Sequence, residues 1–190
     1  MYYGAIKKID IADGPGVRVC LYVSGCRNHC KGCHNPETWN FDFGKEFTED
    51  TIKEILEALK PDYIEGLTIC GGEPFEAENQ IEVWKLIKKV KEIYPNKTIW
   101  AYTGYEWKDL ILGGRKFCIE NKVAITNAIL RNIDVLVVGP FILEQRDITD
   151  NNRWRGSLNQ RLIDVKETLK TSAFLQDCRI VYLKGIPNNN

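Results

Sequence analysis

Three cysteines, Cys26, Cys30 and Cys33, carry the strongest chemical signal in the sequence. Their spacing, C-x-x-x-C-x-x-C, lets one short loop surround a metal centre. Three thiolates can bind three irons of a four-iron four-sulfur cubane, and this stretch offers no fourth cysteine for the remaining iron. Because an open coordination position is typical of a catalytic metal centre, the spacing predicts a reactive cluster.

Two other kinds of metal site fit the same cysteines. A tetrahedral zinc ion needs a fourth ligand, which His29 or His34 could provide. Zinc sites usually have two separated ligand pairs, and this segment has no second pair, so His34 is interpreted as flanking the site. An electron-carrying ferredoxin is the second alternative, but that class normally supplies four cysteines for each cluster.

The other four cysteines are scattered among apolar neighbours. Seven cysteines are an odd number for a disulfide scaffold, and a reducing cytosol keeps thiols free. We expect these four to be buried thiols that act as small hydrophobic side chains. They are Cys20, Cys70, Cys118 and Cys178.

Size and charge limit the classes of protein to consider. A chain of 190 residues that is 44% hydrophobic predicts one domain over residues 1–190. With 26 basic and 26 acidic side chains, it has no net charge to attract nucleic acid or anionic lipid. The N-terminus has no signal-peptide pattern, and no apolar stretch approaches the roughly 20 residues of a membrane span. We therefore expect a cytoplasmic protein that binds neither nucleic acid nor membrane.

Strand and helix patterns alternate along the chain. The segment VRVCLYV at 17–23 is rich in β-branched residues and stops at Ser24 and Gly25, which places the cysteine loop after a strand. Thr51 and Glu54 have the spacing of a helix capping box. The patterns predict strands at 17–23, 67–70, 98–102 and 133–138, and helices at 51–60, 81–94, 107–112 and 124–131.

This order predicts an α/β fold with mainly parallel strands, either an open doubly wound sheet or a partial barrel. Ligands of such folds bind at the carboxyl ends of the strands. Four candidate loops follow predicted strands there: the cysteine loop, GGEP at 71–74, TGY at 103–105 and GP at 139–140.

Together, the cysteine loop and the GGEP turn resemble the radical S-adenosylmethionine (SAM) superfamily. Within it, DGPGVR at 13–18 and CHNPETW at 33–39 are similar to the activating enzymes of glycyl radical enzymes. The TGY turn and WRGSLNQR at 154–161 narrow the resemblance to the activating proteins of anaerobic ribonucleoside-triphosphate reductase. The resemblance extends over residues 10–165.

This resemblance implies a partial (β/α) barrel of the radical SAM type, in which SAM chelates the open iron. A reducing electron donor protein supplies one electron, SAM is cleaved to a 5′-deoxyadenosyl radical, and that radical takes a hydrogen atom from a glycine of the reductase. By position in the motifs, Gly71, Gly72 and Glu73 accept hydrogen bonds from the SAM ammonium group. Gly32, Cys33 and His34 then face the adenine.

Other residues and functions stay open at this stage. Arg153, Arg155 and Arg161 either bind the SAM carboxylate or the partner protein, or form a solvated surface. Val138 stands where the family usually has an acidic residue. The alternative functions are a radical SAM enzyme with a small-molecule substrate, such as a deazapurine-forming synthase, an activase of pyruvate formate-lyase, and a metal-binding module without catalysis.

Overall fold

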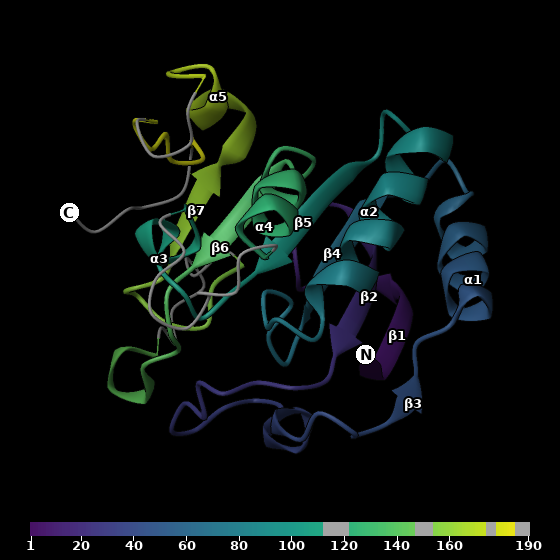
Figure 1. Cartoon of the computed structure of the whole chain (residues 1–190), viewed down its shortest axis with the longest axis horizontal. Helices are drawn as coiled ribbons and strands as arrows, with labels where there is room; N and C mark the ends of the chain where they lie inside the picture. Colours follow the sequence, from purple (N-terminus) through teal and green to yellow (C-terminus); the bar gives the residue numbers. More distant parts are fainter. Residues whose placement is uncertain (112–121, 147–153, 174–177, 185–190) are drawn as a thin grey trace.

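The protein has an α/β fold built on one mixed sheet of seven strands in the order β3-β1-β2-β4-β5-β6-β7 (Figure 1). The computed structural model describes residues 1–111, 122–146, 154–173 and 178–184. Its strands are β1 (Tyr2–Asp10), β2 (Val17–Val23), β3 (Lys45–Glu46), β4 (Ile64–Gly71), β5 (Thr98–Tyr102), β6 (Val135–Val138) and β7 (Arg161–Asp164). Its helices are α1 (Glu49–Leu59), α2 (Gln80–Ile93), α3 (Trp107–Ile111), α4 (Lys122–Leu130) and α5 (Val165–Leu169), with 3-10 turns η1 (Pro36–Trp39) and η2 (Leu143–Gln145).

The centre of the sheet confirms the predicted parallel arrangement. Strands β2, β4, β5 and β6 are parallel neighbours in that order. The predictions for β2 and β5 have the observed bounds, and those for β4 and β6 differ only at the ends. These strands are almost fully buried, which explains why they are rich in β-branched and other apolar residues.

The prediction of mainly parallel strands is wrong for the outer strands of the sheet. Strands β1 and β3 extend one side and β7 the other, and all three pair antiparallel with their neighbours. Strand β1 was missed because several of its side chains are exposed polar groups, so it carries no continuous apolar run. A connection of six residues, 11–16, returns the chain beside β1, whereas parallel pairing requires a much longer crossover.

Helices α1, α2 and α4 cover the same face of the sheet (Figure 1). Each predicted helix is present, with ends shifted by one or two residues; position 112 of the third lies outside the described residues. The apolar stripe of α1 is buried through Ile52, Ile55 and Leu59. None of the helices within the described ranges combines the length and the apolar character needed to cross a membrane.

The start of α1 differs from the predicted capping box. Thr48 is the N-cap, and its hydroxyl accepts a hydrogen bond from the backbone N–H of Thr51. In return, the Thr51 hydroxyl accepts one from the backbone N–H of Thr48. A hydroxyl at the third helical position thus replaces the usual Glu, and the N-cap lies three residues before the predicted Thr51.

A fully buried arginine joins the central strands. Arg18 of β2 donates to the Thr68 hydroxyl at 2.7 Å and to the Leu67 carbonyl at 2.8 Å, both in β4. It also donates to the hydroxyl and carbonyl oxygens of Thr98 in β5. Burial lowers the pKa of Arg18 to about 10, so the guanidinium stays charged at neutral pH. Neutral oxygens therefore stabilise a buried cation across three strands.

We predict that Arg18→Met lowers the free energy of unfolding by about 3 kcal/mol, because it leaves several buried oxygens without their donor. Chemical denaturation of the two proteins measures the difference. Lys53→Met is the control, since Lys53 pairs with Asp50 on the exposed face of α1. Equal unfolding midpoints for Arg18→Met and the parent protein would contradict this role for the buried network.

Candidate active site

Strand register brings the predicted loops together. Val23 at the end of β2 is paired with Gly71 at the end of β4, and Tyr102 at the end of β5 is paired with Val137 of β6. The carboxyl ends of these strands therefore lie side by side. Four segments start there: the cysteine loop, the GGEP turn, the TGY turn and Gly139. This confirms that the carboxyl ends of the strands form the candidate site.

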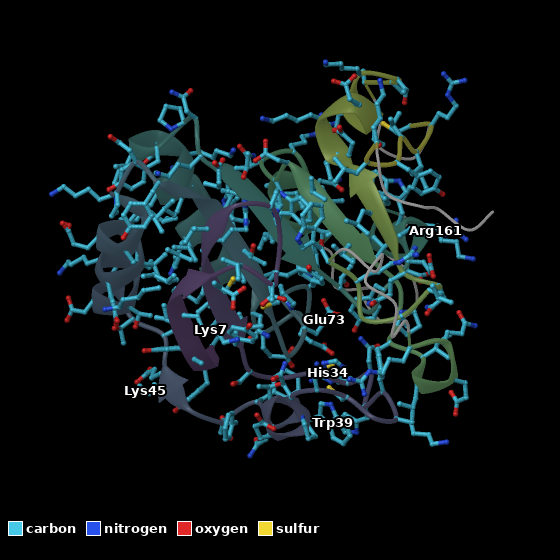
Figure 2. All side chains as sticks on the ribbon, turned by 180° about the vertical axis from the view of Figure 1, so that it is seen from behind. Lys7, His34, Trp39, Lys45, Glu73 and Arg161 are labelled. Atoms are coloured by element: carbon cyan, nitrogen blue, oxygen red, sulfur yellow. The ribbon has the colours of Figure 1, made fainter. Side chains whose placement is uncertain are left out.

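A cavity of about 220 Å³ lies at this edge. It contains all three cysteines of the loop and also His34, Gly71, Gly72 and Glu73, so it joins most of the predicted site residues. Figure 2 shows His34, Trp39 and Glu73 in the same part of the molecule. The remaining lining residues are Asp13, Tyr22, Asn28, Asn35, Trp39, Cys70, Tyr102, Thr103, Gly104, Gly139, Phe141, Gly156 and Gln160.

Backbone hydrogen bonds fix the cysteine loop to the GGEP turn. The N–H of Gly72 donates to the Val23 carbonyl at 2.7 Å, and the N–H of Glu73 donates to the Gly25 carbonyl at 2.9 Å. The N–H of Cys26 donates to the Trp39 carbonyl at 3.2 Å. The first cysteine is therefore held between two segments that are distant from each other in sequence.

Glycine at position 72 is required by the cysteine loop itself. A Cβ atom there would lie 2.7 Å from the Gly25 carbonyl oxygen and 3.0 Å from the Thr38 carbonyl oxygen. Gly71 has a φ of +98°, where side chains are strained, and its Cβ would lie 2.7 Å from the backbone of Tyr22. Close backbone packing thus explains both glycines before any ligand is considered.

Glu73 is a buried carboxylate that joins two strand ends. Its side chain accepts hydrogen bonds from the N–H of Gly104 at 2.7 Å, the N–H of Phe75 at 3.0 Å and the Asn28 amide at 3.3 Å. Burial raises the pKa of Glu73 to about 7, although these donors oppose the shift. A cation that enters the cavity would favour the ionised form.

The cysteine loop is also held by an ion-pair network. Arg27 donates to the Glu76 carboxylate at 2.6 Å and to the Glu78 carboxylate at 2.6 Å, and its backbone N–H donates to Glu76 at 2.9 Å. The guanidinium lies 4.4 Å from the ring centroid of Phe41. Glu76 is buried and accepts a further hydrogen bond from the Tyr105 hydroxyl. These contacts hold Arg27, the residue after Cys26, against the turn that precedes α2.

Burial favours the protonated form of two thiols of the cysteine loop, Cys26 and Cys30. Burial raises the pKa of Cys26 to about 11, with the Glu73 carboxylate adding to the shift, and burial also raises the pKa of Cys30. Metal binding must therefore displace these protons. Cys20 and Cys70 are buried as predicted, and Cys70 also lines the cavity. Cys178 is partly buried, and Cys118 lies outside the described residues.

The two histidines do not form a compact metal site with the cysteines. His29 stacks on Trp39 with ring centroids 4.7 Å apart, and His34 is exposed with its edge toward Phe141. Over the described ranges, the one group of ligand atoms within 4.8 Å of one another comprises Asp10, Asp13 and Cys20. A single zinc ion needs ligand atoms this close, whereas a cubane distributes its thiolates over separate irons.

The remaining predicted residues within the described ranges are absent from the cavity lining. Gly32 is exposed with a φ of +74°, and a Cβ there would meet the Leu143 side chain at 2.9 Å. Arg155 is buried and bonds the carbonyls of its own loop, whereas Arg161 is exposed and donates to the Tyr182 hydroxyl at 3.0 Å. The solvated-surface alternative therefore fits Arg161 but not Arg155. Arg153 lies outside the described residues.

Several residues of the cavity wall were not predicted. The Tyr22 hydroxyl donates to Asp13 at 2.5 Å, and burial raises the pKa of this carboxyl. Gln160 accepts from the N–H of Gly156 at 2.7 Å and donates to the Gly139 carbonyl at 2.9 Å. Asp13 belongs to the DGPGVR motif and Gln160 to the WRGSLNQR motif, so these motifs could have indicated both residues. Nothing in the sequence distinguishes Tyr22 from other strand residues.

Comparisons with known proteins identify the family. A family described as a 4Fe-4S single cluster domain matches residues 12–163. An anaerobic ribonucleoside-triphosphate reductase-activating protein from enterobacteria phage T4 is 38% identical over 162 residues, which cover 85% of this chain and 93% of the relative. The chain belongs to the family of these activating proteins. Those from Vibrio cholerae and Escherichia coli K12 are 39% and 33% identical, each covering 84% of this chain and 96% of the relative.

The match to the 4Fe-4S single cluster domain indicates an iron-sulfur cluster rather than zinc. The residues present fit such a group, because three thiols line one cavity whose walls are fixed by backbone hydrogen bonds. Buried polar side chains also line the cavity, among them Gln160 and Thr103.

We predict that Arg27→Gln loosens the cysteine loop, because it removes the cation that joins Glu76 and Glu78. Iron should be released to a chelator several-fold faster than from the parent protein, at a temperature at which both proteins remain folded. Lys31→Gln is the matched control, since Lys31 is in the same loop but forms an exposed pair with Glu144. Identical release rates for Arg27→Gln and the parent would exclude a role for this network in holding the cluster.

Proposed function

We propose that Cys26, Cys30 and Cys33 bind three irons of a four-iron four-sulfur cluster and leave the fourth iron for SAM. The observation that carries this proposal is the shared cavity, which the three cysteines line together with the turn from Gly71 to Glu73. Family membership supports the cluster, and the resemblance of the motifs supports SAM. Because the cysteine loop and the turn are joined by backbone hydrogen bonds, each would position the ligand bound by the other.

The SAM ammonium group would bind beside the backbone of Gly71 and Gly72. The Glu73 carboxylate already accepts hydrogen bonds from Gly104 and Phe75. It would contribute to SAM binding through its buried negative charge and its remaining lone pairs. Bound SAM would lower the pKa of this carboxyl, and the charge pair would form in a site shielded from water. Gly32, Cys33 and His34 would flank the adenine.

The activity that follows is activation of an anaerobic ribonucleoside-triphosphate reductase. When bound, the reduced cluster and SAM supply methionine and a 5′-deoxyadenosyl radical, which takes a hydrogen atom from a glycine of the reductase to leave 5′-deoxyadenosine and a glycyl radical. The protein's own residues hold these groups and exclude water from the cavity. The names of the similar proteins support the choice of the reductase as partner.

The proposal also includes the domain organisation, the electron donor and the kind of partner. Residues 1–190 would form one radical SAM domain, with the central parallel strands as part of a partial (β/α) barrel. A separate reducing protein would supply the electron in the cytoplasm. The balanced charge, with 26 basic and 26 acidic side chains, supports specific protein partners over nucleic acid.

We predict that replacing any one of Cys26, Cys30 and Cys33 by Ala abolishes the native cluster and SAM cleavage, because each thiolate holds one iron. Iron and sulfide analysis of anaerobically purified protein measures the loss, and the visible spectrum identifies the cluster. Cys178→Ala is the control and should keep full iron content, because Cys178 is outside the cavity lining. Normal iron content in any of the three loop variants would refute the ligand assignment.

We predict a glycyl radical when the protein is mixed anaerobically with SAM, a strong reductant and its cognate reductase. The radical should appear as a doublet in the electron paramagnetic resonance spectrum, together with reductase activity, and both should vanish in air. A reductase that stays radical-free despite an intact cluster and measurable SAM cleavage would sink the activase assignment. The small-molecule alternative or pyruvate formate-lyase as partner would then be favoured.

A further inference from the structure

Two side-chain amides of the WRGSLNQR motif bind the segment that follows β6. Gln160 donates to the Gly139 carbonyl at 2.9 Å, and Asn159 donates to the Pro140 carbonyl at 2.8 Å. The side-chain oxygen of Gln160 also accepts from the N–H of Gly156 at 2.7 Å. Because both donors and acceptors of the Gln160 amide are engaged, this side chain joins the turn at 156–160 to the end of β6.

The same turn also binds the continuation of that segment. The Ser157 hydroxyl accepts from the N–H of Ile142 at 3.1 Å and donates to the Asn159 oxygen at 2.6 Å. The backbone N–H of Leu158 donates to the Gln145 carbonyl at 2.9 Å. Residues 139–145, here called the wall segment, are therefore held by the turn along their whole length.

The wall segment packs on the second half of the cysteine loop. Its contacts are Phe141 with the His34 ring at a centroid distance of 5.2 Å, Leu143 at 2.9 Å from the position of a Gly32 Cβ atom, and Glu144 with Lys31 at 3.0 Å. Burial raises the pKa of the Cys30 thiol, and a hydrogen bond from the Phe141 backbone opposes this shift. Gly139 and Phe141 line the same cavity as the cysteines.

The first half of the cysteine loop is held by other parts of the chain. The N–H of Cys26 donates to the Trp39 carbonyl at 3.2 Å, and the Arg27 side chain donates to Glu76 at 2.6 Å. These contacts come from η1 and from the turn before α2, whereas the wall segment comes from β6. A change at the wall segment should therefore affect Cys30 without affecting Cys26.

We infer that Asn159 and Gln160 are positioning residues, which hold the wall segment against residues 30–34 and so fix this half of the cysteine loop. The consequence rests on the proposed function, in which Cys30 binds iron and residues 32–34 flank the adenine of SAM. Release of the wall segment would then weaken SAM binding, because the adenine side of the site would lose its support.

The first experiment measures alkylation of the reduced, metal-free protein by iodoacetamide, in the parent, Asn159→Ala and Gln160→Leu. Trypsin cleaves after Arg27 and Lys31 and so separates the three loop cysteines, which mass spectrometry then quantifies one by one. We expect Cys30 to react several-fold faster in both variants than in the parent, with the rate at Cys26 unchanged.

The second experiment measures SAM binding to the anaerobic, cluster-loaded proteins by calorimetry. With equal iron and sulfide content, Asn159→Ala should have a several-fold larger dissociation constant and KM for SAM. Its rate of SAM cleavage at saturating SAM should be little changed. Gln145→Ala is the matched control for both experiments, since it removes an exposed amide side chain of the wall segment and keeps the backbone bond to Leu158.

The results separate this inference from the proposed function. Equal Cys30 rates in Asn159→Ala and the parent would overturn the inference, as would equal acceleration at Cys26 and Cys30, which indicates general loosening. An unchanged SAM dissociation constant in Asn159→Ala would overturn the positioning role toward SAM. A parent protein that holds no cluster would instead refute the proposed function, and the alkylation rates would still decide whether the amides hold the loop. If Gln160→Leu does not fold, Asn159→Ala decides alone.

Discussion

Two backbone hydrogen bonds join the GGEP turn to the start of the cysteine loop, and the site depends on them. They run from Gly72 to the Val23 carbonyl and from Glu73 to the Gly25 carbonyl. The second requires the loop to pass so close to the turn that a Cβ atom at position 72 would collide with it. Since backbone groups make these bonds, the position of Cys26 relative to the turn is fixed without the mobility of long side chains.

Around this junction, buried charges are compensated locally. Glu76 is matched by Arg27, and Arg18 is stabilised by oxygens of β4 and β5. Glu73 is the exception, since burial raises its pKa to about 7 and only neutral donors bond it. A buried carboxylate without a cationic partner in the described structure favours a positively charged ligand in the cavity.

The sequence predicted the parts of the fold whose signals are local. Strand β2 was recognised because VRVCLYV is rich in β-branched and aromatic residues and is followed by a Ser-Gly turn, and the α2 stripe was recognised by its helical period. Strand β1 was missed because its exposed face is polar, and the antiparallel sides of the sheet were missed with it. The α1 cap was misplaced because a Thr hydroxyl replaced the expected Glu.

By itself, the sequence determined that one loop carries three closely spaced thiols, and the spacing of Cys26, Cys30 and Cys33 limits which metal centre such a loop can surround. Only the tertiary structure decided which other side chains line the same cavity. Tyr22, Trp39 and Gln160 come from three distant segments, and their meeting at one cavity depends on strand register and on the return of the chain through η1. Such contacts result from packing of the whole sheet, so no local pattern in the sequence records them.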